Sequence, residues 1–150
     1  MPEQEVWKDI KGYEGAYQVS TLGRIRSLKR TFLDRRGHKQ SIPYKVLKPE
    51  YKRTGYERIC LSKNGKHKHF MVAKLVYETF VGPVPKGLEI DHINGTRADN
   101  RLANLRICTH KENCNNPVSL ARNIAANESR RRKLKEYWAK KKATSMKRCL

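Results

Sequence analysis

Apolar residues recur at short intervals through residues 7–30, with glycines between them. The apolar residues of this stretch are Trp7, Ile10, Tyr13, Tyr17, Val19, Leu22, Ile25 and Leu28. This pattern predicts short strands joined by turns. Residues 24–28 alternate between basic or polar and apolar side chains, which is typical of a strand with one face on a core. The polar and charged run at 31–42 predicts an exposed loop.

A β-hairpin followed by a helix is predicted in the middle of the chain. Two strand-like runs, 56–62 and 66–72, flank Asn64-Gly65, which is the strongest short signal for a hairpin turn. The next apolar residues, at positions 73, 76, 77 and 80, follow helical spacing. The glycines and prolines of residues 82–87 end that helix.

Residues 88–116 predict the order strand, loop, strand, helix. Residues 88–92 and 105–108 are short apolar runs, and the polar stretch between them begins with a turn signal. The helix that follows has a capping box, in which Thr109 caps the first turn and Glu112 reaches back to the Thr109 amide. The helix would cover the strand pair.

The end of the chain favours a helix without a strong packing face. Its sparse apolar residues are Leu120, Ile124, Leu134 and Trp138. Residues 117–150 hold 11 Lys and Arg against two Glu, which indicates a basic arm. We therefore predict an α+β protein with an N-terminal β-rich module at 1–50, a central domain at 51–116 and a helical arm at 117–150.

The charge balance indicates a polyanionic partner. The chain carries 34 Lys and Arg against 14 Asp and Glu, a net charge of +20, with a pI near 10.1. A membrane surface is the rival partner, but the sequence shows no apolar run of transmembrane length, no signal peptide and no myristoylation site. We expect nucleic-acid binding, no membrane contact and a cytoplasmic location. The four cysteines form no Cys-x-x-Cys pair, so we expect reduced thiols and no zinc knuckle.

One short segment offers the groups that phosphodiester hydrolysis needs. This reaction requires an activated water, a cation for the developing phosphoryl charge and help for the departing oxygen. His92 directly follows Asp91 at a strand end, so the two side chains point to opposite sides. One can hold a metal while the other faces the substrate phosphate. Asn104 at the start of the second strand and Asn113 on the following helix complete the candidate set.

These residues lie in runs that resemble the HNH endonucleases, most closely the phage and intron-encoded homing branch. The runs are Glu89-Ile-Asp-His-Ile-Asn-Gly95, Asp99-Asn-Arg-Leu-Ala-Asn-Leu-Arg106 and Thr109-His-Lys-Glu-Asn113. Upstream, residues 7–28 look like the Trp-led DNA-binding module that often precedes this nuclease. Two independent motifs in the expected order are more specific than either alone.

The resemblance implies a ββα-metal nuclease core and a role for each candidate residue. Asp91 and Asn113 would bind one divalent cation, Mg²⁺ or Mn²⁺, with phosphate oxygens and water completing its shell. His92 would be the general base that takes a proton from the attacking water. Asn104 would hold the catalytic loop and orient the His92 ring. Because the third motif residue is Asn113 rather than histidine, the case for zinc is weakened.

The implied activity is hydrolysis of double-stranded DNA, by nicking or double-strand cleavage, by a monomer in the cytoplasm of a bacterial host, with a phage as a candidate source. Basic side chains in the two motifs and in the arm are the expected DNA contacts. They are Arg24, Arg26, Lys29, Arg30, Arg106, Arg130, Arg131, Arg132 and Lys133. Charge runs of this kind also occur as solvated faces, and that alternative stays open.

Other assignments compete with these. His110, or His67 and His69 on one face of a strand, are alternative metal ligands, while Asn100 and Arg101 are expected to satisfy loop backbone groups. A rival function is a catalytically inactive HNH scaffold that binds DNA in phage regulation or packaging. A third is an RNA-binding or ribosome-associated protein, which explains the charge but not the motif.

Overall fold

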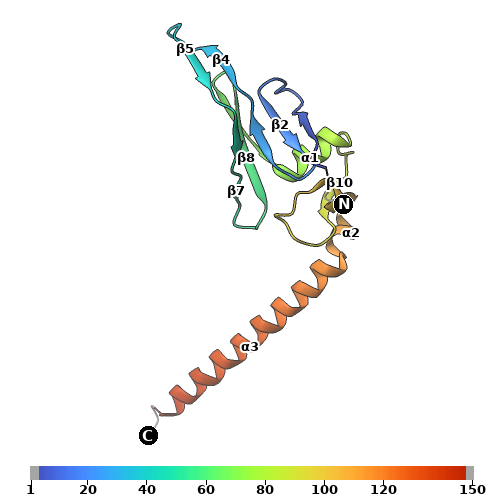
Figure 1. Cartoon of the computed structure of the whole chain (residues 1–150). Coiled ribbons are helices and arrows are strands. Elements are labelled where there is room, and N and C mark those ends of the chain that lie inside the picture. The colour runs from blue at the N-terminus through green and yellow to red at the C-terminus, as the bar shows by residue number, and fades with distance from the viewer. Residues whose placement is uncertain (1–3, 148–150) are drawn as a thin grey trace. The chain divides into compact units, whose positions relative to one another are not determined.

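The computed structural model describes residues 4–147, with side chains placed through Lys141 (Figure 1). The chain divides into two compact units, one ending at His110 and one beginning at Lys111. The predicted α+β class is confirmed. The first unit contains β1 (Trp7–Asp9), β2 (Tyr17–Ser20), β3 (Ile25–Ser27), β4 (Arg30–Leu33), β5 (Lys39–Ile42), β6 (Lys45–Leu47), β7 (Glu50–Tyr51), β8 (Glu57–Lys63), β9 (Lys66–Met71), α1 (Val72–Phe80), β10 (Leu88–His92), the 3₁₀ turn η1 (Leu102–Asn104) and β11 (Leu105–Thr109).

The N-terminal strands form an antiparallel sheet in the order β1-β2-β3-β6. The alternation predicted for residues 24–28 is present in β3, where Ile25 and Ser27 are buried and Arg26 is half-buried. Val19 of β2 and Ile25 pair across the two strands and enter the core. The predicted strands of this region are therefore confirmed.

Residues 31–42 form a two-stranded ribbon, β4–β5, so the prediction of a loop there was wrong. All side chains of both strands are exposed or half-buried, so no face of the ribbon is covered and no alternation marks it in the sequence. The turn is built by Asp34, whose carboxylate accepts hydrogen bonds from the backbone N–H groups of Arg36 and His38, both 2.9 Å. These bonds lower the pKa of the Asp34 carboxyl.

The predicted hairpin and helix are confirmed. β8 and β9 pair antiparallel, and β7 adds to the other edge of β8. Asn64 and Gly65 have φ values of 52° and 72°, the left-handed conformation that a tight two-residue hairpin turn requires. α1 then packs Leu75 and Val76 into the core.

One hydrophobic core serves the whole first unit. It joins Val19 and Ile25 of the N-terminal sheet to Leu61 of β8, Val76 of α1 and Leu105 of β11. The sequence-based division near residue 50 therefore does not separate two cores. Strands on both sides of that boundary bury their apolar faces against α1 and against each other.

The second unit is helical. α2 (His110–Cys114) begins directly after Thr109, where the capping-box pattern places its start. α3 (Pro117–Lys147) confirms the predicted helix; the Val118 N–H donates to the Asn116 side-chain oxygen at 3.1 Å, and Pro117 occupies the first helical position. Its four apolar residues named above are all exposed. Residues 148–150 of the predicted arm lie outside the described residues.

Among the described residues, no helix is long and apolar enough to span a bilayer. Cys60, Cys108 and Cys114 form no disulfide, and Cys149 lies outside the described residues.

Candidate active site

The β10–β11 hairpin places the two central candidate residues side by side at its closed end. Asp91 and His92 are the last residues of β10, opposite Arg106 and Leu105 of β11. Both side chains are buried, with 5% and 4% of their surface exposed. A buried carboxylate beside a buried imidazole is costly unless each has polar partners, so their contacts define what the site can do.

Arg106 forms an ion pair with the Asp91 carboxylate. Its Nε and Nη2 donate to Asp91 Oδ2 at 3.0 and 2.9 Å. The pair results from strand register, because the two residues face each other across the hairpin. The guanidinium offsets the cost of burying the carboxylate and brings positive charge to the site. Arg106 was predicted to contact DNA, and its ion pair with Asp91 was not predicted.

Asn104 holds the loop between the two strands. The Asn94 N–H donates to Asn104 Oδ1 at 3.0 Å, and Asn104 Nδ2 donates to Asn94 Oδ1 and to the Asp99 carbonyl. The Ile93 N–H also donates to the Asn104 carbonyl at 2.9 Å. Asn104 thus fixes the backbone that directly follows His92. It is the last residue of η1, whereas the sequence placed it at the start of the second strand.

A second set of bonds rigidifies the same loop. Arg101 donates to both carboxylate oxygens of Asp99, at 2.8 and 2.7 Å, and Asn94 Nδ2 donates to Asp99 Oδ2. The Arg101 hydrogen bonds, followed by the Asn94 bond, lower the pKa of Asp99 to about 2. The carboxylate therefore keeps its charge, and its contacts, down to strongly acidic pH.

The His92 ring contacts Asn100 and Tyr56, neither of which is among the predicted catalytic residues. Its Nε2 lies 3.0 Å from Asn100 Oδ1, and the Tyr56 ring lies 5.9 Å from it, centroid to centroid. The side-chain bonds of Asn104 all go to the loop, so the amide at the imidazole is that of Asn100. The contact between Tyr56 and His92 is visible only in the structure, because the two residues are far apart in the sequence.

Asp91 suits a hard divalent cation, because such ions prefer carboxylate and amide oxygens. Asn113, the expected second ligand, lies on α2 in the second unit. The alternative ligand His110 pairs through Nδ1 with Glu89 Oε1 at 3.0 Å. His67 and His69 lie on β9, and within the described residues no three His, Cys, Asp or Glu side chains are grouped to hold a metal.

The expected DNA contacts fall into two groups. Arg24 pairs with Glu5, and the Arg26 guanidinium stacks 4.1 Å from the centre of the Trp7 ring. Arg30 donates to the Ala16 carbonyl at 2.8 Å. These three side chains take part in the fold of the N-terminal module. The remaining basic candidates besides Arg106 are exposed: Lys29, Arg130, Arg131, Arg132 and Lys133.

Comparison with known proteins identifies two motifs. Residues 5–62 match the NUMOD4 motif, and residues 70–114 match an HNH endonuclease family. The chain is 42% identical over 113 residues to DNA endonuclease I-HmuI of Bacillus phage SP01, covering 75% of this chain and 58% of that protein. It is 30% identical over 113 residues to the HNH endonuclease L245 of Acanthamoeba polyphaga mimivirus, covering 75% of this chain and 30% of that protein.

A solved structure gives the same result. It describes DNA binding and cleavage by the HNH homing endonuclease I-HmuI, and it matches with a TM-score of 0.60 and 39% identity, over 83% of this chain and 68% of that one. The chain thus spans little more than half the full length of I-HmuI. The order of the two motifs, the fold and the identity lead to one conclusion. This chain belongs to the HNH homing endonuclease family.

Proposed function

We propose that this protein is a DNA endonuclease that hydrolyses phosphodiester bonds with His92 as general base and a divalent cation, Mg²⁺ or Mn²⁺, at Asp91. The observation that carries the proposal is the pair of buried, adjacent side chains at the end of β10, on a loop locked by Asn104. A solved relative of the same fold is described as binding and cleaving DNA.

Each side chain has a part in the proposed reaction. The His92 imidazole accepts a proton from the water that attacks the scissile phosphorus. As the new P–O bond forms, the bond from phosphorus to the 3′-oxygen breaks, and the departing 3′-oxygen takes a proton from solvent water. Asp91 would hold the cation with its carboxylate, and the resemblance to the family motif implies Asn113 as the second ligand. When bound, the cation stabilises negative charge on the phosphoryl oxygens. Arg106, fixed beside Asp91, adds positive charge at the same place.

Double-stranded DNA is the proposed substrate, held mainly through its phosphates. The exposed Lys29 and the α3 residues Arg130–Lys133 supply positive charge for phosphate contacts. Arg24, Arg26 and Arg30 can add contacts while keeping their internal partners, because a guanidinium has five N–H donors. A monomer with one such site cuts one strand at a time and therefore nicks.

A plasmid assay tests the proposed activity. Supercoiled plasmid is incubated with the purified protein and Mg²⁺, Mn²⁺ or EDTA, and the nicked and linear forms are followed with time. The proposal expects metal-dependent nicking that EDTA abolishes. DNA binding without cleavage under every metal condition would instead show a DNA-binding protein on an inactive scaffold. Preferential binding of structured RNA over duplex DNA in competition would favour the RNA-binding alternative.

A further inference from the structure

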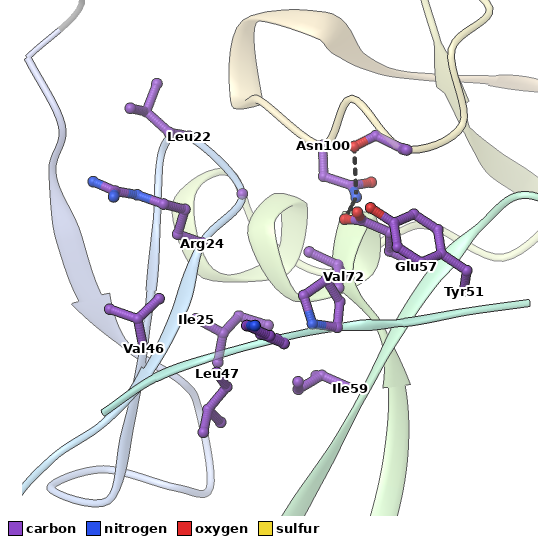
Figure 2. A pocket seen from close by; sticks show the side chains of 14 residues that line it. Leu22, Arg24, Ile25, Val46, Leu47, Tyr51, Glu57, Ile59, Val72 and Asn100 are labelled. Atoms are coloured by element: carbon purple, nitrogen blue, oxygen red, sulfur yellow. Dashed lines mark hydrogen bonds between the residues drawn. The ribbon is translucent and has the colours of Figure 1, made fainter. Parts of the chain in front are cut away.

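The Asn100 side chain lies between the His92 ring and a carboxylate from another part of the chain. Its Oδ1 is 3.0 Å from His92 Nε2, and its Nδ2 donates to Glu57 Oε2 at 2.8 Å. Figure 2 shows the second bond, with Asn100 on the loop and Glu57 on β8. Asn100 is 96% buried and Glu57 is half-buried, and both line the pocket drawn in Figure 2.

Glu57 decides which way the Asn100 amide faces. An ionised carboxylate only accepts hydrogen bonds, so the Asn100 NH₂ group must point to Glu57 and its carbonyl oxygen to His92. An amide oxygen also only accepts, so the hydrogen of the His92 contact belongs to Nε2. A neutral imidazole that donates from Nε2 carries its lone pair on Nδ1.

The backbone of Asn100 is held in place by the N-terminal module. A Cβ on Gly23 would lie 2.9 Å from both the Cβ and the carbonyl oxygen of Asn100, closer than atoms can pack. The Leu102 N–H donates to the Thr21 carbonyl at 2.8 Å in the same region. The β2–β3 turn therefore contacts the loop at Asn100, and only a glycine fits at position 23.

Two further side chains lie in this region in addition to Asn100, Tyr56 at the His92 ring and Arg97 at the Tyr56 ring. The Tyr56 ring packs on the imidazole, and the Arg97 guanidinium lies 5.0 Å from the centre of the Tyr56 ring. A hydrogen bond to the Glu57 carboxylate raises the pKa of the Tyr51 hydroxyl, which places a second donor on Glu57. The Glu57 carboxylate therefore accepts the first of the two hydrogen bonds that lead through Asn100 to His92.

We propose that Glu57 and Asn100 form a positioning relay that sets the His92 tautomer, with the proton on Nε2 and Nδ1 as the proton-accepting nitrogen. Glu57 belongs to the NUMOD4 match and His92 to the HNH match, so one motif orients the base of the other. The part of the proposal that concerns catalysis rests on the proposed function. The tautomer itself does not depend on it.

The tautomer is measured directly in the intact protein. Two-dimensional ¹⁵N–¹H spectra of ring-labelled histidines, recorded at alkaline pH, distinguish an Nε2–H ring from an Nδ1–H ring. His92→Gln assigns the signal. The relay predicts an Nε2–H ring for His92 in the unaltered protein and a mixture in Asn100→Ala. An Nδ1–H ring in the unaltered protein would overturn the proposal, whether or not the protein cuts DNA.

A charge-swap pair tests the relay through catalysis. Asn100→Asp sets two carboxylates against each other, so we expect kcat to fall on the order of 10- to 100-fold with little change in KM. Adding Glu57→Gln restores a donor to the new carboxylate, and the double variant should recover at least about 10-fold in kcat. Glu57→Gln alone should keep far more turnover than Glu57→Ala, because a glutamine oxygen still accepts the Asn100 bond.

The matched control is Glu50→Ala, which removes the same residue type from the adjoining strand β7, where it pairs with Arg58. It should leave kcat and the His92 tautomer as they are. If Glu57→Ala behaves like this control, or if the double variant is no better than Asn100→Asp, the relay is wrong even though plasmid cleavage by the unaltered protein continues. Absence of cleavage by every protein, with an Nε2–H ring, would instead overturn the proposed function and keep the tautomer assignment.

Discussion

The two units of this chain differ in how far their apolar and basic side chains are buried and bonded. In the first, Leu61 is fully buried and Arg24, Arg26 and Arg30 are bonded to neighbouring groups. On α3, Leu134 is 57% exposed, and Arg130, Arg131, Arg132 and Lys133 are exposed as well. The first unit uses its residues to hold a fold and a site. The second carries exposed basic side chains at Arg130–Lys133, so mutations in the two units should affect different measurements.

The largest contrast is expected in stability. Leu61→Ala should lower the free energy of unfolding by about 2–5 kcal/mol, because it opens a cavity in the shared core. Leu134→Ala, the matched change on α3, should stay within about 0.5 kcal/mol. Urea unfolding followed by tryptophan fluorescence and circular dichroism measures both. Equal losses would show that α3 packs on a partner surface and that the two units are not independent.

Metal dependence tests the two proposed ligands, Asp91 and Asn113. Asp91→Ala should raise the half-saturating Mg²⁺ concentration for cleavage more than Asn113→Ala does, because a carboxylate contributes charge and an amide only a dipole. The expected difference is on the order of 10-fold. Metal titrations of the initial cleavage rate give the values. Unchanged half-saturation in both variants would remove these residues from the coordination shell.

The loop that follows His92 should show a specific acid sensitivity. The folded pKa of Asp99, about 2, lies below its ordinary value of 3.8, so its contribution is complete above about pH 4 and is lost as pH falls towards 2. Asp99→Asn should therefore cost about 1–2 kcal/mol at neutral pH and progressively less below about pH 4. Unfolding curves from pH 2 to 7 show this convergence; a constant difference at every pH would reject it.

The smallest effect on stability is expected for the α3 charges. Replacing Arg130, Arg131, Arg132 and Lys133 together by glutamine should leave the unfolding midpoint nearly unchanged. It should also reduce the slope of log affinity against log salt by about 0.9 for each DNA phosphate that these residues neutralise. The contrasting variant is Arg26→Gln, which removes the stacking on Trp7 and should cost about 1 kcal/mol of stability. An unchanged slope in the fourfold variant would show that α3 is a solvated face.

Local sequence signals were sufficient for the elements that bury one face. Asn64-Gly65 located the hairpin, and the spacing of apolar residues located α1. The β4–β5 ribbon was not predicted because neither of its faces is covered, so its sequence lacks the alternation that marks a strand. Its one visible signal was the turn built on Asp34.

For the candidate site, the sequence identified residues more readily than contacts. Asp91 and His92 could be selected because they stand together at a strand end, and their catalytic roles stay predictions. The Asp91–Arg106 ion pair could have been inferred from antiparallel register, since opposite charges often face each other across strands. The Glu57–Asn100 bond could not, because it joins positions 43 residues apart through a shared core.

The central claim, that His92 is the base of a DNA endonuclease, is tested most directly by one pair of measurements on His92→Ala. Single-turnover cleavage of plasmid at saturating protein and Mg²⁺ gives the rate, and binding to the same DNA in Ca²⁺ gives the affinity. We expect the rate to fall on the order of 10²- to 10⁴-fold while the affinity changes little. A variant that cuts within a few-fold of the unaltered protein would contradict the assignment.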